Sequence, residues 1–154
     1  PWYNDAFDEE LEGEPHGKKI VGAIKQSFAA NGKDIRSTLV AVTIPETVMI
    51  IGECAFDMCS NLQQVFGGRS VREIGASAFY GTALTTNKNF ENVIKIGGCA
   101  FYGCDLQKIY LPETLNYIGE EAFTFVSDPT ITNIYYAENN KNPSVEKFYG
   151  KIKG

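Results

Sequence analysis

The chain has 154 residues, of which 44% are hydrophobic and 21% are charged, and its formal net charge is −5. This length suits one folded domain, and no apolar run approaches the roughly 18 residues that indicate a membrane-spanning helix. The excess of acids lies in one short segment that contains Asp5, Asp8, Glu9, Glu10, Glu12 and Glu14. Without this segment, 13 of the 19 acidic residues remain against 14 Lys and Arg. A nearly neutral body argues against a nucleic-acid binder that neutralises phosphates.

Residues 1–34 are expected to form an acidic lead-in followed by a capping helix. Because the chain begins at Pro1 and not at Met, we expect a mature or trimmed fragment. The spacing predicts a helix over residues 18–30, with Asn31-Gly32 as its stop signal. The apolar residues that set this helical spacing are Ile20, Val21, Ile24 and Phe28.

A strand motif follows at Leu39–Pro45 and returns at Leu106–Pro112, with the pattern L-x-x-V/I-x-I/L-P. The alternating aliphatic residues predict a short strand with one buried side, and proline is expected to end it. Two intermediate versions of the motif depart from this pattern, because Gly67-Gly68 and Asn89-Phe90 replace the aliphatic residue and the proline. Asn87 also replaces an inward aliphatic residue. We expect these coils to be less regular or to contain an internal polar contact.

The phrase I-G-x-x-A-F occurs four times, and its phenylalanines recur every 22 or 23 residues. A fixed period of this length predicts a solenoid in which each repeat stacks on the next one. The glycine is expected to permit a backbone bend, and the alanine is expected to let neighbouring coils approach closely. The phenylalanines are expected to form a buried spine, defined as Phe56, Phe79, Phe101 and Phe123.

These phrases together resemble the BspA-like leucine-rich repeats of bacterial and some protozoan surface proteins. The resemblance covers residues 35–137 and includes the F-x-x-C continuation at Phe56–Cys59 and Phe101–Cys104. It implies an α/β solenoid: a right-handed leucine-rich-repeat superhelix with one short parallel strand per repeat, turns or short helices on the other side, and a helical N-terminal cap. Residues 138–154 are expected to form a C-terminal cap or linker.

The cysteines occupy two repeat positions, one with Cys54 and Cys99 and one with Cys59 and Cys104. The members of each pair are two repeats apart, which corresponds to roughly 10 Å at ordinary strand spacing and exceeds the ~7 Å limit for a disulfide. We therefore expect free thiols.

No stretch predicts a catalytic, metal or cofactor site. The single histidine, His16, lies in a Pro-Gly segment without an adjacent base or nucleophile, and no phosphate-binding glycine motif is present. The acidic segment lacks the spacing of a calcium loop. We expect a protein that is not an enzyme; a hydrolase acting on an extracellular polymer would need an ordered cluster of acids in a groove.

The repeat register predicts which strand residues point away from the core. One outward position carries Thr43, Phe66, Lys88, Tyr110 and Tyr135, and another carries Ala41, Gln64, Thr86, Lys108 and Asn133. Exposed aromatic residues on a rigid platform are typical anchors of a protein interface, although they can also simply cover a sheet.

The resemblance implies a secreted or cell-surface recognition and adhesion module without enzymatic activity. Its partner would be a protein such as host matrix or another microbe's surface protein, bound through the outward strand residues. The alternative is a spacer within a larger surface protein, with no ligand of its own.

Overall fold

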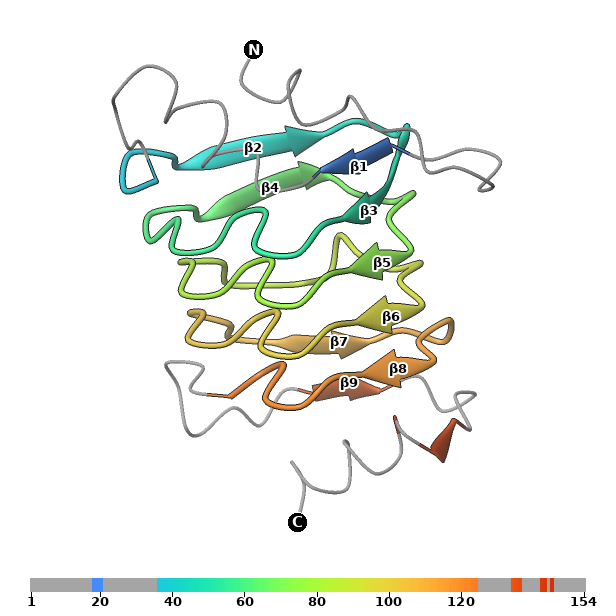
Figure 1. Cartoon of the computed structure of the whole chain (residues 1–154). Helices are drawn as coiled ribbons and strands as arrows, with labels where there is room; N and C mark the ends of the chain where they lie inside the picture. The colour runs from blue at the N-terminus through green and yellow to red at the C-terminus, as the bar shows by residue number, and fades with distance from the viewer. Residues whose placement is uncertain (1–17, 21–35, 125–133, 137–141, 144, 146–154) are drawn as a thin grey trace.

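The structure is a computed structural model that describes residues 18–20, 36–124, 134–136, 142, 143 and 145. Within these residues the chain winds as a stack of coils, and Figure 1 shows strands on two sides of the stack. The predicted solenoid of short parallel strands is therefore confirmed.

The strand motif forms two separate two-stranded sheets, which we call together the first sheet and whose register agrees with the repeat period. Its strands are β2 (Ala41–Ile44), β4 (Gln64–Gly67), β7 (Ile109–Leu111) and β9 (Ile134–Tyr136). β2 pairs in parallel with β4, and β7 pairs in parallel with β9. Between β4 and β7 lies the coil that contains Leu84 to Phe90, which we call the central coil. On this side of the stack it contributes only an isolated parallel bridge from Thr86 to Lys108. The register places Thr43 opposite Phe66 and Tyr110 opposite Tyr135.

A second sheet occupies the side on which turns or short helices are predicted. It consists of β1 (Lys18–Ile20), β3 (Val48–Ile51), β5 (Glu73–Ile74), β6 (Lys95–Ile96) and β8 (Tyr117–Ile118), in that order. All of its pairings are parallel. The expectation of one strand per repeat is therefore wrong, because each regular coil supplies a strand to both sheets.

The N-terminal helical cap is not supported. Lys18–Ile20, where the helix is predicted to begin, is the strand β1, which pairs with β3 and extends the second sheet. Pairing with β3 gives hydrogen-bond partners to backbone N–H and carbonyl groups along the open edge of that sheet. This stabilisation outweighs the local preference for a helix that the apolar spacing indicates. The remainder of the predicted helix and the acidic lead-in lie outside the described residues.

The I-G-x-x-A-F phrases form a stack of turns between the second sheet and the next strand of the first. Backbone groups hydrogen-bond from coil to coil, for example from the Phe79 N–H to the Ala100 carbonyl at 2.8 Å. The left-handed backbone conformation falls on the fourth residue of each phrase, with φ of 56° or 57° at Cys54, Ser77, Cys99 and Glu121. The glycine does not supply this bend. It permits close approach, since a Cβ at Gly97 would lie 2.5 Å from the Ala76 nitrogen.

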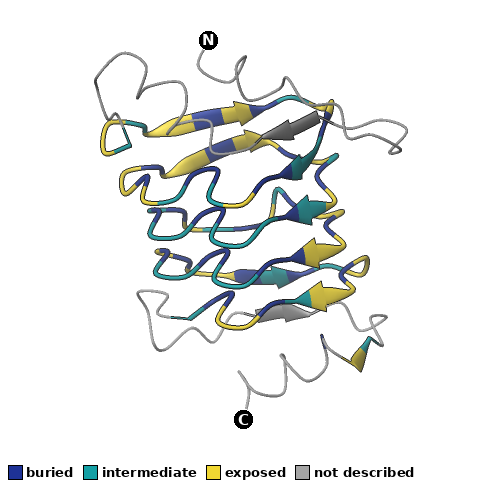
Figure 2. Cartoon of the chain, in the orientation of Figure 1, coloured by how far each residue is buried: buried dark blue, intermediate teal, exposed yellow. Residues whose placement is uncertain are grey.

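The phenylalanine spine runs through the centre of the stack. Consecutive rings are stacked with centroids 5.3, 5.4 and 5.3 Å apart, and all four side chains are buried. The repeat leucines pack beside them in the same hydrophobic core. Figure 2 shows buried and exposed residues alternating along β2, with the exposed ones at its outward positions. Each fully buried phenylalanine contributes roughly 1.5–3 kcal/mol through the removal of apolar surface from water.

The irregular central coil is held by side chains in place of strand pairing. Asn87 is buried, and its amide exchanges two 2.8 Å hydrogen bonds with the backbone N–H and carbonyl of Tyr110. Phe90 turns into the core and contacts two rings of the spine. A Cβ at Gly68 would lie 2.9 Å from the Phe90 ring, so the glycine provides the space for this inward turn. The predicted internal polar contact is present.

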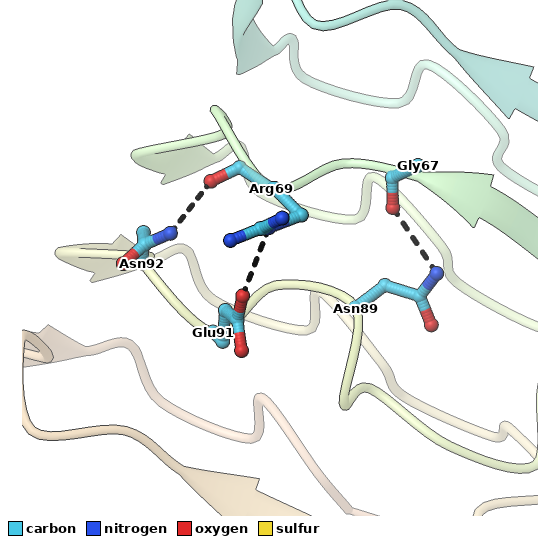
Figure 3. A network of polar contacts seen from close by, with 5 residues as sticks. All are labelled: Gly67, Arg69, Asn89, Glu91 and Asn92. Carbon is cyan, nitrogen blue, oxygen red and sulfur yellow. Dashed lines mark hydrogen bonds and ion pairs between the residues drawn. The ribbon is translucent and has the colours of Figure 1, made fainter.

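Further contacts attach the central coil to the coil that contains β4, as Figure 3 shows. The Asn89 side chain donates hydrogen bonds to the carbonyls of Val65 and Gly67 at 2.8 and 3.1 Å. Asn92 donates to the Arg69 carbonyl at 2.9 Å, and Arg69 forms a 3.1 Å ion pair with Glu91. The ion pair is solvent-exposed, so the amide contacts contribute more to the attachment of this coil.

Candidate interaction surface

The outward side of the first sheet carries the residues that the repeat register selects. We call this surface the strand face and define it by three columns of side chains. Its two predicted columns contain, within the described residues, Ala41, Gln64, Thr86 and Lys108 in one and Thr43, Phe66, Lys88 and Tyr110 in the other. Thr86 and Tyr110 are half-buried, and the others are exposed. The backbone of Tyr135 lies in β9 beside Tyr110, but its side chain and Asn133 lie outside the described residues.

A third outward column was missed by the sequence reasoning. It consists of Val40, Gln63, Thr85 and Gln107, all of which are exposed. Each of them directly follows a repeat leucine, so the same period that identified the other columns could have identified this one. The column widens the strand face, and its glutamines and threonine can donate or accept hydrogen bonds, whereas Val40 adds apolar surface.

Two aromatic positions dominate the strand face. The Phe66 side chain is 51% exposed, so it presents apolar surface to the solvent on this face. Tyr110 lies under the Lys88 ammonium group, whose nitrogen is 5.9 Å from the ring centroid. The hydrogen bonds from Asn87 fix the Tyr110 backbone, and the Thr86 hydroxyl accepts the Lys88 N–H at 3.1 Å. Hydrogen bonds thus hold the backbone from which the Lys88 and Tyr110 side chains project.

The charge of the strand face has one sign. Among its described residues, the three columns contain Lys88 and Lys108 and no Asp or Glu. Carboxylates occur only beyond the ends of the strands, for example at Asp105 and Glu113.

The outer side of the second sheet has a different composition. Its aligned residues Ile50, Glu73, Lys95 and Tyr117 are apolar, acidic, basic and aromatic in turn. Lys95 lies 3.8 Å from the Glu73 carboxylate and 5.6 Å from the Tyr117 ring centroid. The charge of Lys95 is therefore compensated within the sheet itself.

The thiols have no disulfide partners, as the repeat spacing predicts, since all four cysteines are free. Cys104 is buried, donates to the Phe79 carbonyl at 3.0 Å and lies 3.1 Å from the Thr82 hydroxyl. Burial raises the pKa of Cys104 to about 11. Partial desolvation and the adjacent Glu121 carboxylate raise the pKa of Cys99. Neither group is activated as a nucleophile, because activation requires a lowered thiol pKa.

Neither a metal site nor a membrane span is found within the described part of the chain. No three His, Cys, Asp or Glu side chains there are grouped so that they could hold a metal ion. None of the helices there has the length and apolar character needed to cross a membrane.

Comparison with known proteins identifies the repeat. The model of the BspA type leucine rich repeat region, in 6 copies, matches residues 35–153. The match includes residues 138–153, beyond the repeats that are recognisable by eye. No curated protein and no solved structure matches the chain. The family is typically surface-associated and generally non-enzymatic. The stacked coils, their register and the family match agree, and the chain belongs to the BspA type leucine rich repeat family.

Proposed function

We propose that this protein is a non-enzymatic recognition or adhesion module, secreted or displayed at a cell surface, that binds a protein partner through its strand face. The observation that carries the proposal is the exposed Phe66 beside the Lys88–Tyr110 pair on a rigid sheet. Rigid aromatic side chains bury much area at small entropic cost, and they are enriched among the residues that dominate binding energy. Membership of a typically surface-associated family supports the same function.

The mechanism of the proposed module is rigid shape complementarity. The phenylalanine spine and the coil-to-coil hydrogen bonds fix the spacing of the strands. The strands in turn fix the spacing of the outward side chains, so little conformational entropy is lost on binding. Matrix proteins and microbial surface proteins are the partners expected for such a module. The second function, a spacer without a ligand, would leave the strand face unused.

Binding to a defined surface tests the proposal. Matrix laid down by cultured cells and then stripped of those cells is one probe, and intact bacterial cells are another. The full chain should be retained on at least one of them and lost when that surface is first treated with protease. The double variant Phe66→Ala/Tyr110→Ala should reduce retention at least tenfold, because both aromatic anchors are removed.

The matched control removes two large exposed side chains on the other side of the solenoid, one in β8 and one directly before β6. Ile94 and Tyr117 are 37% and 46% exposed, so Ile94→Ala/Tyr117→Ala deletes comparable surface without touching the strand face. Retention of this variant should equal that of the unmodified chain. Equal losses for both double variants would overturn the strand face as the site. Absence of retention on every untreated surface would overturn the recognition function in favour of the spacer.

A further inference from the structure

We propose that the stacked rings of Tyr80 and Tyr102 are an oxidative cross-linking site, at which a haem peroxidase and hydrogen peroxide join the two phenols into dityrosine. The product would tie two neighbouring coils of the solenoid together covalently. The inference concerns the turns that carry the I-G-x-x-A-F phrases, so it goes beyond the proposed function and does not depend on the strand face.

The first observation is the close contact between the two rings. Each tyrosine directly follows a phenylalanine of the spine, so the repeat period places both at the same position of neighbouring coils. The ring centroids of Tyr80 and Tyr102 are 4.8 Å apart, and the ring planes differ by 2°. The flanking coils of the described chain have Asp57 and Thr124 at this position. A radical formed on either tyrosine therefore has the other phenol as its stacked neighbour.

The second observation is that backbone hydrogen bonds hold the two tyrosines side by side. Before them in the chain, the Phe79 N–H donates to the Ala100 carbonyl at 2.8 Å. After Tyr80, the Gly81 N–H donates to the Tyr102 carbonyl at 2.7 Å. Reacting groups that are held in contact combine as if they were present at a very high local concentration. Coupling within one chain should therefore exceed coupling between chains.

The third observation concerns access to the rings and their freedom to turn. Tyr80 and Tyr102 are half-buried, so part of each side chain is open to an oxidant in solution. Each is followed by a glycine, Gly81 or Gly103, which adds no side chain beside the rings. A Cβ at Gly103 would lie 3.8 Å from the Gly81 Cα, its nearest neighbour outside the adjoining residues. This space lets the rings turn from the parallel stack until their reacting carbons meet.

The coupling reaction balances with peroxide as the oxidant. Each tyrosine loses one electron and its phenolic proton to become a tyrosyl radical. The two radicals combine through a new carbon–carbon bond between the ring positions adjacent to the hydroxyls. The hydrogen on each of these carbons then moves to the phenol oxygen, which restores both aromatic rings. Hydrogen peroxide accepts the two electrons and two protons, its O–O bond breaks, and two water molecules form.

A nearby thiol is the competing reductant for the radical. Partial desolvation and the neighbouring Tyr80, Glu121 and Cys99 raise the pKa of Tyr102, which places Cys99 within electrostatic reach of the phenol. The Cys99 thiol donates to the Glu121 carboxylate at 3.8 Å. Partial desolvation and this carboxylate raise the pKa of Cys99, so the thiol stays protonated at neutral pH. Oxidation of cysteine follows its thiolate character, so coupling of the two phenols is favoured over repair by Cys99.

Peptide mapping of the full chain after treatment with a haem peroxidase and hydrogen peroxide tests the proposal. Trypsin places Tyr80 in the peptide 73–88 and Tyr102 in the peptide 96–108, and neither peptide contains another tyrosine. Mass spectrometry should find these two peptides joined with the loss of two hydrogen atoms, together with dityrosine fluorescence. The peptide 73–88 has no cysteine, so the link cannot be a disulfide. Tyr80→Phe keeps a ring in the stack and should abolish the joined species.

The matched control is Tyr117→Phe, which removes an exposed phenol from the second sheet and should leave the joined species unchanged. A mixture of isotope-labelled and unlabelled chain should give joined peptides that are both labelled or both unlabelled. Joined peptides of mixed label would overturn the site within one chain. Dityrosine that forms only at other tyrosines would also overturn it.

A covalent link between neighbouring coils should also stabilise the solenoid, because it restricts the unfolded chain. The cross-linked chain should therefore reach its unfolding midpoint at a higher urea concentration than untreated chain. Tyr80→Phe that has received the same treatment should keep its original midpoint. An unchanged midpoint for chain that carries the cross-link would overturn its role in tying the two coils together.

Discussion

The turn side of the solenoid, which carries the I-G-x-x-A-F phrases, has the same repeat period as the strand face. The residue types are repeated on the turn side and varied on the strand face. On the turn side the same residue types return in each coil, and the phenylalanine and alanine of each phrase are buried. On the strand face each coil presents a different outward side chain, for example Thr43, Phe66, Lys88 and Tyr110. The repeated positions hold the stack together, and the varied positions are the ones left in contact with solvent. Substitutions on the two sides should therefore separate stability from binding.

The largest expected effect is on the turn side, at the middle of the spine. Phe101→Ala removes a ring that stacks on Phe79 and Phe123 at 5.4 and 5.3 Å. The cavity and the lost contacts should lower the free energy of unfolding by about 3–5 kcal/mol. Urea denaturation followed by circular dichroism measures this change. The same substitution at the exposed Phe66 should cost less than about 0.5 kcal/mol. Similar values for the two variants would contradict the distinction between the sides.

A smaller loss of stability is expected at the glycine that lets coils approach. A Cβ at Gly97 would meet the Ala76 nitrogen at 2.5 Å and the Gly75 carbonyl carbon at 2.7 Å, and both are backbone atoms that cannot rotate away. Gly97→Ala should destabilise the protein by about 2–3 kcal/mol. The adjacent Gly98 is the matched control. A Cβ added there would lie 3.3 Å from its nearest neighbour, the backbone carbonyl oxygen of Glu120. Gly98→Ala should cost less than about 1 kcal/mol, and the reverse order would contradict the close-approach explanation.

The buried thiol adds a pH dependence to the turn side. The pKa of Cys104 is raised from 9.0 to about 11, mainly by burial, so the folded state keeps a proton that the unfolded state has lost. The contribution of the protonated thiol to the free energy of unfolding is fully present below pH 9. It declines by roughly 2–3 kcal/mol as the pH rises toward 11. Denaturation at several pH values should show this decline. Cys104→Ala should be less stable at neutral pH but should show a shallower decline, and an unchanged slope would contradict the assignment.

The central coil should respond through its hydrogen bonds. Asn87→Leu restores an aliphatic residue at the inward position but leaves the Tyr110 N–H and carbonyl without their 2.8 Å partners. The loss should be about 1–3 kcal/mol, reduced by the apolar surface gained. Asn92→Ala removes a single exposed contact to the Arg69 carbonyl and should cost about 0.5 kcal/mol. A stabilised Asn87→Leu variant would show that the polar contact is dispensable.

The repeat period predicted the first sheet and its register because every coil must place the same positions against its neighbours. It did not reveal the second sheet, since strands such as Glu73–Ile74 and Lys95–Ile96 are too short to show alternation. The strand β1 was also missed, because its pairing with β3 depends on a distant segment. Phe90 stands at the repeat position that Pro45 and Pro112 occupy in two other coils, and its inward turn depends on the space beside Gly68, which no local pattern encodes.

For the interaction surface, the register identified Phe66, Lys88 and Tyr110 as outward residues before their neighbours were known. The cation–π contact between Lys88 and Tyr110 follows from the same register, because the two residues lie on adjacent coils. The column that begins with Val40 was overlooked, although it has the same period. Sequence alone could not show that Lys95 of the second sheet is paired with Glu73, since the pairing depends on side-chain geometry.

Lysine acetylation of the chain while it is bound tests the central claim most directly. Acetylation by a mild amine reagent, read by mass spectrometry, compares Lys88 and Lys108 on the strand face with Lys95 on the second sheet, all three of which are exposed. Bound to the matrix or cell surface that retains it, the chain should show protection of Lys88 and Lys108 and an unchanged rate at Lys95. Protection of Lys95 with continued modification of Lys88 and Lys108 would contradict the account and place the partner on the opposite sheet.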